Sequence, residues 1–122
     1  MLGIDYRDSR PIYEQVVDGV EEMIVRGVWG PDTQLPSVRQ LASELSINPN
    51  TIQRAYGELE KRGVIYSVKG RGNFVSGDGS LLRSRRLQEI GKQIAELVAA
   101  ARALGADENQ LRAWLDGKGE DA

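Results

Sequence analysis

Hydrophobic residues recur every three or four positions through the first half of the chain, which is the spacing of one face of an α-helix. The first such stretch predicts a helix that begins at Arg10-Pro11, with Ser9 as its cap, and ends at Gly27. Its apolar stripe consists of Ile12, Val16, Val20, Met23 and Ile24.

Two further helices are predicted, with a short break at residues 46–48 between them. Ser37 and Gln40 have the spacing of a capping box that opens the second helix, whose stripe is Val38, Leu41, Ala42 and Leu45. The third helix covers residues 49–62. Asn48 is placed to cap it by accepting a hydrogen bond from the N–H of Asn50 or Thr51, and Pro49 suits its first position. Its core face holds Ile52, Ala55, Tyr56 and Leu59.

A different pattern follows Gly63. The alternating, β-branched run VIYSV, the turn KGRG and the return NFVS predict a β-hairpin over residues 64–76. The glycines of this turn are explained by a need for positive φ. A phosphate-loop interpretation of the GRG motif is weak, because no helix follows and Val75 occupies the place of a third glycine. The next four residues, GDGS, have the composition of a flexible joint.

The last region predicts a long helix with a short heptad seam, and Gly105 ends it. Asp107 and Gln110 then open a final short helix that carries Leu111, Trp114 and Leu115. Two interpretations of the seam remain open: it pairs with a second copy of the chain, or it folds back on Ile12–Ile24 of its own chain. We favour the first. The seam residues are Leu87, Ile90, Ile94, Leu97, Ala101 and Leu104.

This order of elements predicts a mainly α protein with a small β-hairpin. The fold class is a winged helix-turn-helix followed by a helical dimerisation tail, because two helices joined by a tight turn precede a hairpin that forms the wing. We assign residues 1–78 to a DNA-binding domain and residues 79–122 to the tail.

Composition narrows the function further. The 122-residue chain has no cysteine and no histidine, so disulfides, thiolate metal sites and the commonest general base are excluded. No paired carboxylates or nucleophile–base set suggest an enzyme, and no cofactor or metal is predicted. The chain has no membrane-spanning run and no signal pattern, and we expect a cytoplasmic protein.

The net charge of −2 appears unsuited to a polyanionic partner, but charge is segregated along the chain. Residues 1–35 carry a net charge of −4, whereas residues 36–76 and 79–102 carry +3 each. The predicted helix-turn-helix and wing are therefore locally basic.

On a helical wheel, Asn50, Arg54, Gly57 and Lys61 lie opposite the core face of the third helix. Asn and Arg match the hydrogen-bonding edges of adenine and guanine, and the N-terminal residues of a recognition helix meet base edges. The simpler alternative is an ordinary solvated surface. The remaining predicted DNA contacts are Thr51 and Gln53 beside this face, Ser37 and Arg39 at the second helix, and Lys69, Arg71 and Gly72 in the wing.

The stretch LPSVRQLASELSINPNTIQRAYGELEKRGVIYSVKGRGNFV resembles the winged-helix domain of GntR-family bacterial transcription regulators. With PIYEQ, NPNT and RAY, it resembles the small YtrA-type subfamily in particular. The resemblance covers residues 4–76 and implies Arg39, Asn50, Thr51, Arg54 and Gly72 as DNA contacts. One departure is Asp32, where the family often has glycine.

The resemblance implies a homodimeric regulator, a repressor, that binds a two-fold symmetric DNA operator, with control of transporter genes as the suggested target. The operator sequence, the regulated genes and any small-molecule effector stay unknown. Two alternatives are a sequence-neutral architectural DNA-binding protein and a winged helix used for protein–protein contact. Asn50 and Arg54 argue against the first, and the basic wing argues against the second.

Overall fold

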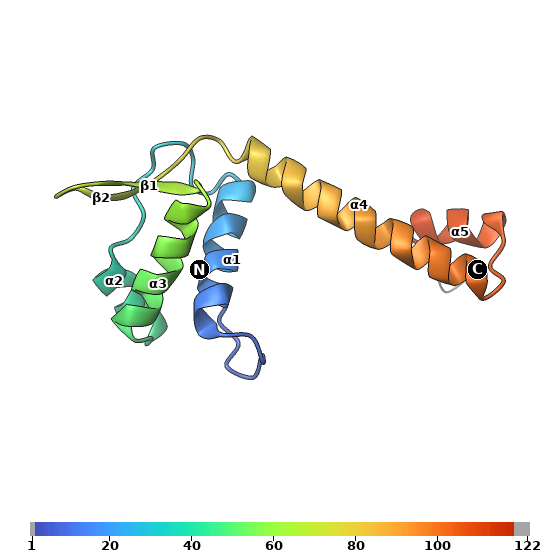
Figure 1. The fold of residues 1–122 in the computed structure, drawn as a ribbon, viewed down its shortest axis with the longest axis horizontal. Helices are drawn as coiled ribbons and strands as arrows, with labels where there is room; N and C mark the ends of the chain where they lie inside the picture. The colour runs from blue at the N-terminus through green and yellow to red at the C-terminus, as the bar shows by residue number, and fades with distance from the viewer. Residues whose placement is uncertain (1, 119–122) are drawn as a thin grey trace. The chain divides into compact units, whose positions relative to one another are not determined.

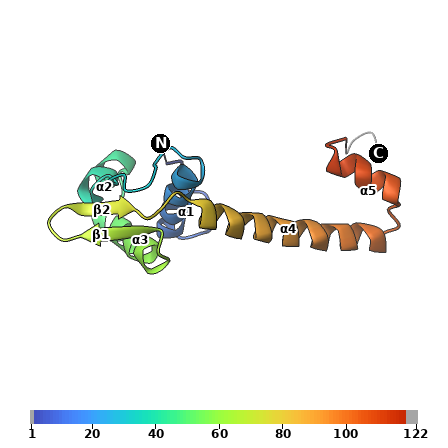
Figure 2. The same ribbon diagram turned by 90° about the horizontal axis from the view of Figure 1, so that it is seen from above.

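The computed structural model describes residues 2–118, and the chain divides into two compact units, Met1–Arg83 and Ser84–Ala122. Within the described residues the fold is mainly helical, with one antiparallel pair of strands (Figures 1 and 2). The fold class predicted from the sequence, a winged helix-turn-helix with a helical tail, is confirmed.

Three helices form the centre of the first unit: α1 (Ile12–Val25), α2 (Val38–Leu45) and α3 (Pro49–Lys61). Helix α3 packs between α1 and α2, and its predicted core face is buried (Figure 1). Val16, Val17 and Val20 of α1 close the core from the other side. The Ser9 cap is wrong. Because α1 begins at Ile12, Pro11 takes the cap position, without a side-chain cap, and Ser9 lies two residues too early.

The other predicted helix starts are confirmed. Ser37 Oγ accepts a hydrogen bond from the Gln40 N–H, and Gln40 Oε1 accepts one from the Ser37 N–H. Between α2 and α3 the chain turns at Ser46, which adopts a left-handed conformation with φ of 54°. Tyr56 then ties α3 to the segment before α2, since its hydroxyl donates to the Pro36 carbonyl at 2.7 Å and burial raises the pKa of that hydroxyl.

The wing consists of β1 (Ile65–Val68) and β2 (Gly72–Val75), paired antiparallel with Ile65 opposite Val75. A third piece of extended chain, between the first two predicted helices, joins the sheet through an isolated bridge from Gln34 to Phe74. The turn before this bridge contains Asp32 with φ of 61°, a conformation that favours glycine. This explains the one departure noted above: Asp32 adopts the glycine-like backbone, and its carboxylate accepts a hydrogen bond from the Tyr66 hydroxyl at 2.7 Å.

The joint after the wing is not the flexible linker that its composition predicted. A Cβ atom on Gly79 would lie 3.1 Å from the Ile24 carbonyl oxygen, so the backbone here is pressed against the end of α1. Leu82, in the first turn of α4 (Ser80–Ala103), packs against the core. Arg83 donates to the carbonyls of Val25 and Asp78. Contacts with a distant part of the chain therefore fix residues 79–83.

The second unit pairs the rest of α4 with α5 (Glu108–Leu115), which turns back beside it. The predicted capping box of Asp107 and Gln110 is present. An apolar hollow of about 270 Å³ lies between the two helices. Its lining residues are Ile94, Leu97, Val98, Ala101, Leu111, Trp114 and Leu115. Among residues 2–118, no helix has the length and hydrophobicity to cross a membrane.

Candidate nucleic-acid interface

The N-terminus of α3 has a rigid start and an exposed polar surface. Asn48 Oδ1 accepts a hydrogen bond from the Asn50 N–H at 2.8 Å, and Pro49 occupies the first turn. Directly beyond this cap the side chains of Asn50, Gln53 and Arg54 are exposed, and Thr51 is half-buried. The cap fixes the backbone from which these side chains project, as a recognition surface requires.

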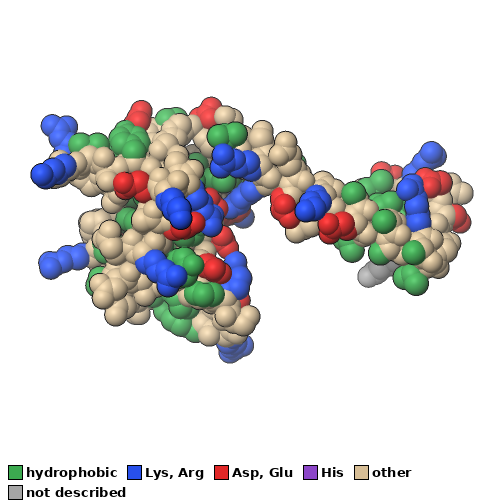
Figure 3. Space-filling view, viewed as in Figure 1, with side chains coloured by type: hydrophobic (Ala, Val, Ile, Leu, Met, Phe, Trp, Pro, Cys, Tyr) green, Lys and Arg blue, Asp and Glu red, His purple; other side chains and the backbone are tan. Residues whose placement is uncertain are grey.

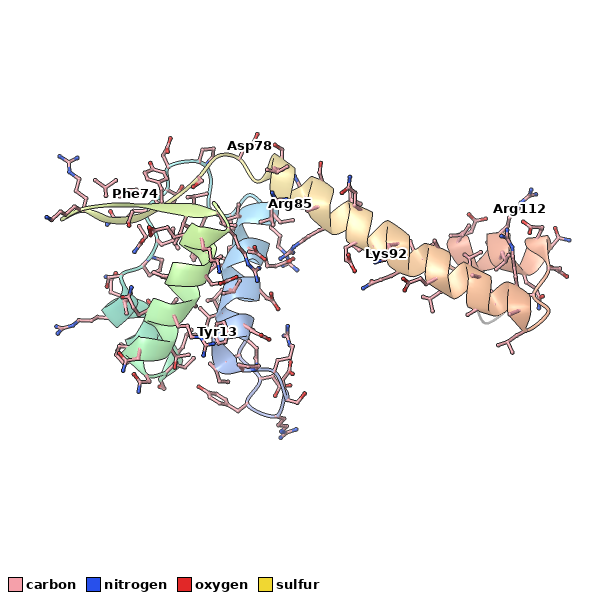
Figure 4. The ribbon with its side chains drawn as sticks, in the orientation of Figure 1. Tyr13, Phe74, Asp78, Arg85, Lys92 and Arg112 are labelled. Carbon is pink, nitrogen blue, oxygen red and sulfur yellow. The ribbon has the colours of Figure 1, made fainter. Side chains whose placement is uncertain are left out.

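Arg54 does not extend freely from α3. Its guanidinium carbon lies 3.9 Å from the centroid of the Tyr13 ring, in cation–π contact. Tyr13 comes from the first turn of α1 and is half-buried against the core; Figure 4 shows it on the side of α1 next to α3. The N-terminal ends of the two helices therefore share one surface.

An open hollow of about 430 Å³ lies at this shared surface. Its lining residues are Pro11, Ile12, Tyr13, Asn50, Thr51 and Arg54. Three of the predicted DNA contacts are thus brought together beside the start of α1. Asparagine and arginine side chains in such a place can hydrogen-bond base edges or phosphate oxygens.

At the start of α2, Ser37 and Arg39 are both exposed. The Ser37 N–H is not available to a phosphate group, because it donates to Gln40 Oε1 at 2.9 Å. The Ser37 hydroxyl proton and the Arg39 guanidinium are the groups that this helix start presents.

The wing presents Lys69 and Arg71 as exposed side chains on its turn, and basic side chains gather at the hairpin tip in Figure 3. Gln34 holds the turn in place, since its Nε2 donates to the Arg71 carbonyl at 2.8 Å. Gly72 has φ of 116°, and a Cβ atom there would lie 3.0 Å from Gln34 Nε2. The backbone conformation and this close contact therefore explain the glycine at position 72 independently of any DNA contact.

Below the tip, the rings of Tyr66 and Phe74 stack with centroids 5.6 Å apart. The hydrogen bond to the Asp32 carboxylate raises the pKa of the Tyr66 hydroxyl. These contacts stiffen the two strands that carry the basic turn.

Two residues of this surface were missed from the sequence. Tyr13 was part of the PIYEQ motif but was given no role, and Gln34 lies between the first two predicted helices, in a segment to which no element was assigned. Both act through contacts across more than 30 residues, which local periodicity does not reveal. No group of three or more histidine, cysteine, aspartate or glutamate side chains suited to a metal ion occurs among residues 2–118.

Comparison with known proteins shows the family of this chain. Residues 12–75 match the family described as "Bacterial regulatory proteins, gntR family". The chain is 37% identical over 116 residues to the HTH-type transcriptional repressor YtrA of Bacillus subtilis (strain 168). The alignment covers 94% of this chain and 89% of that protein.

Solved structures give the same result. A GntR family transcriptional regulator from Listeria monocytogenes is 38% identical, with a TM-score of 0.69 over 90% of this chain and 96% of that one. AraR(DBD) in complex with operator ORE1 is 30% identical, with a TM-score of 0.55 over 62% of this chain and 93% of that one. The similar structure in this second case is therefore a domain solved in complex with operator DNA. The chain belongs to the GntR family of bacterial transcription regulators.

Proposed function

We propose that this protein is a repressor that reads a two-fold symmetric DNA operator as a homodimer. The observation that carries the proposal is the surface at the start of α3, where a capped helix presents Asn50, Gln53 and Arg54 beside a rigid basic wing. The relatives named above support it, since one is named a repressor and another was solved on an operator.

We assign the contacts by position. Asn50, Thr51, Gln53 and Arg54 read base edges in the major groove, as residues at the start of a recognition helix do. Ser37 and Arg39 contact the phosphate backbone from α2. Lys69, Arg71 and Gly72 contact the backbone or the minor groove from the wing, where a lysine and an arginine bring charge without sequence preference.

The tail, residues 79–122, serves dimerisation. Along α4 five of the six seam side chains are exposed, with 68% of Leu87, 69% of Leu97 and 91% of Leu104 accessible, and Ala101 is half-buried. Exposed leucines at heptad spacing on one helix are typical of a surface that pairs with another chain. Leu115 of α5 is 67% exposed and continues this apolar surface beside the hollow.

A dimer explains how so small a domain reaches useful specificity, because two half-sites are read together. The protein acts in the cytoplasm on the control region of an operon, for which transporter genes are the suggested target.

The deciding experiment is selection of bound duplexes from a random DNA pool. An inverted repeat with fixed half-site spacing is the expected result. Recovery of DNA without a shared motif would contradict sequence-specific reading and favour an architectural role. Failure to retain any DNA at low salt, where phosphate contacts are strongest, would leave protein contact as the function of the winged helix.

A further inference from the structure

Tyr13 lies outside the helix-turn-helix, yet it is in direct contact with one of the proposed reading residues. The central carbon of the Arg54 guanidinium lies over the Tyr13 ring, 3.9 Å from the ring centroid. Arginine over the face of an aromatic ring is attracted by the ring quadrupole. The interaction joins the first turn of α1 to the second turn of α3.

The two partners differ in mobility. Tyr13 is half-buried and packs against the core, so the position of its ring is set by the fold. Arg54 is exposed, and a free arginine side chain samples many rotamers that must be given up when it binds. A fixed ring under the guanidinium removes part of that freedom before DNA arrives.

The position of the stack fits a role in reading. Tyr13 and Arg54 line the same open hollow as Asn50 and Thr51, so the ring holds the guanidinium beside two other proposed contacts. An arginine reads guanine through two parallel hydrogen bonds, which demand a defined plane for the guanidinium. The contact restricts the guanidinium while Arg54 stays exposed, so its N–H groups can still donate to DNA.

We propose that Tyr13 is a positioning residue for DNA reading: it holds the Arg54 guanidinium in the orientation that contacts the operator. The inference rests on the proposed function. It extends the reading surface from the helix-turn-helix to the start of α1 and adds a residue that selects sequence without touching a base.

The test is a double-mutant cycle on the full chain with the selected operator. Tyr13→Ala, Tyr13→Phe, Arg54→Ala and the double variant Tyr13→Ala/Arg54→Ala are compared with wild type by fluorescence anisotropy. Tyr13→Ala is expected to weaken binding about two- to fivefold, the size of an exposed cation–π contact. Tyr13→Phe keeps the ring face and is expected to bind within about twofold of wild type.

The sharpest result comes from the Arg54→Ala background. There Tyr13→Ala is expected to change nothing further, because the side chain that it positions is gone. Base preference, measured on a panel of single-base operator variants, is expected to relax at the same position in Tyr13→Ala and Arg54→Ala. A purely structural role of Tyr13 would lower affinity equally in both backgrounds and at every operator variant.

Three results would overturn the proposal: an equal loss from Tyr13→Ala with and without Arg54, no loss at all, or a loss in Tyr13→Phe as large as in Tyr13→Ala. The last would mean that the hydroxyl itself contacts DNA. Failure of the proposed function is seen separately, since it appears in wild type as binding without any sequence motif.

Discussion

Gly57 lies in the middle of α3, on the face that carries Asn50 and Arg54. A Cβ atom at this position would meet nothing within 4 Å, so the fold itself does not require glycine here. Glycine inside a helix costs about 0.5–1 kcal/mol of stability relative to alanine. We interpret a residue that weakens its own helix without a packing reason as a sign of close approach by another molecule, and on the proposed reading face that molecule would be the operator DNA.

Gly57→Ala is therefore expected to raise the free energy of unfolding by about 0.5–1 kcal/mol and to weaken operator binding. Chemical denaturation and a binding titration measure the two effects. Gly91→Ala is the matched control, since Gly91 is a helical glycine in α4 that also has open space around it. Gly91→Ala should raise the free energy of unfolding without changing the affinity for DNA. Unimpaired binding by Gly57→Ala would show that the operator stays away from this part of α3.

Substitution of two glycines of the joint distinguishes the cost of a strained backbone conformation from the cost of a close contact. Gly77 and Gly79 have φ of 74° and 81°, so an alanine at either position is strained. Only at Gly79 would the added Cβ atom also press on Ile24, at 3.1 Å. We expect Gly77→Ala to cost about 1 kcal/mol and Gly79→Ala about 1–3 kcal/mol more, measured by thermal unfolding. Equal losses of stability in the two variants would show that residues 79–83 can shift to accommodate the added methyl group.

At the scale of single residues, sequence reasoning was most successful where the partner was a few positions away, although the Ser9 cap failed because α1 begins later than that cap requires. The caps by Asn48, Ser37 and Asp107 are local hydrogen bonds, and each is present. It did not find Tyr13, because a helical wheel shows which way Arg54 points but not which other helix lies there.

Among the elements, the wing is the one whose contribution to binding should be mostly electrostatic. Its tip carries Lys69 and Arg71, and the hydrogen bond from Gln34 fixes the turn between them. Each phosphate neutralised by a basic side chain releases condensed counterions, which makes affinity fall as salt rises.

Replacing Lys69 and Arg71 by glutamine should flatten the plot of log affinity against log salt by about one to two units of slope per protomer. Motif preference should change little, because phosphate contacts carry no direct sequence information. The double variant Lys92→Gln/Arg112→Gln, which removes the same charge from the tail, is the control for net charge. An unaltered slope in the wing variant would place its tip off the DNA.

The elements themselves were largely predictable, and the errors have physical reasons. The three helices of the core follow from apolar stripes at helical spacing, and the hairpin follows from alternation around a glycine turn. The bridge from Gln34 to Phe74 was missed because it involves too few residues to show a strand pattern. The joint was misjudged because GDGS was interpreted by composition, whereas the contact of Gly79 with Ile24 is formed by residues 55 positions apart.

At the scale of the whole molecule, the proposed dimer needs a surface that joins the DNA-reading surfaces of two protomers. Ile94, Leu97 and Ala101 of the seam line the hollow beside α5, so the apolar surface is built by two helices instead of the single seam expected. A partner that covered it would bury Trp114 and Leu115 together with the seam. This surface is the reason to expect assembly through the tail.

Leu97→Asp tests this directly. Leu97 is in the middle of the seam and 69% exposed, so the first unit does not depend on it for its core. An unpaired carboxylate in an apolar contact costs several kcal/mol, and the dimer is expected to dissociate while the helical content stays. Operator affinity should then fall steeply, because each half-site is bound without the advantage of linkage.

Ala99→Asp, which puts the same charge on the opposite side of α4, should stay dimeric. Light scattering, circular dichroism and a binding titration decide the outcome: a dimeric, tightly binding Leu97→Asp protein places the interface elsewhere, and a globally unfolded one makes the seam part of the core of its own chain.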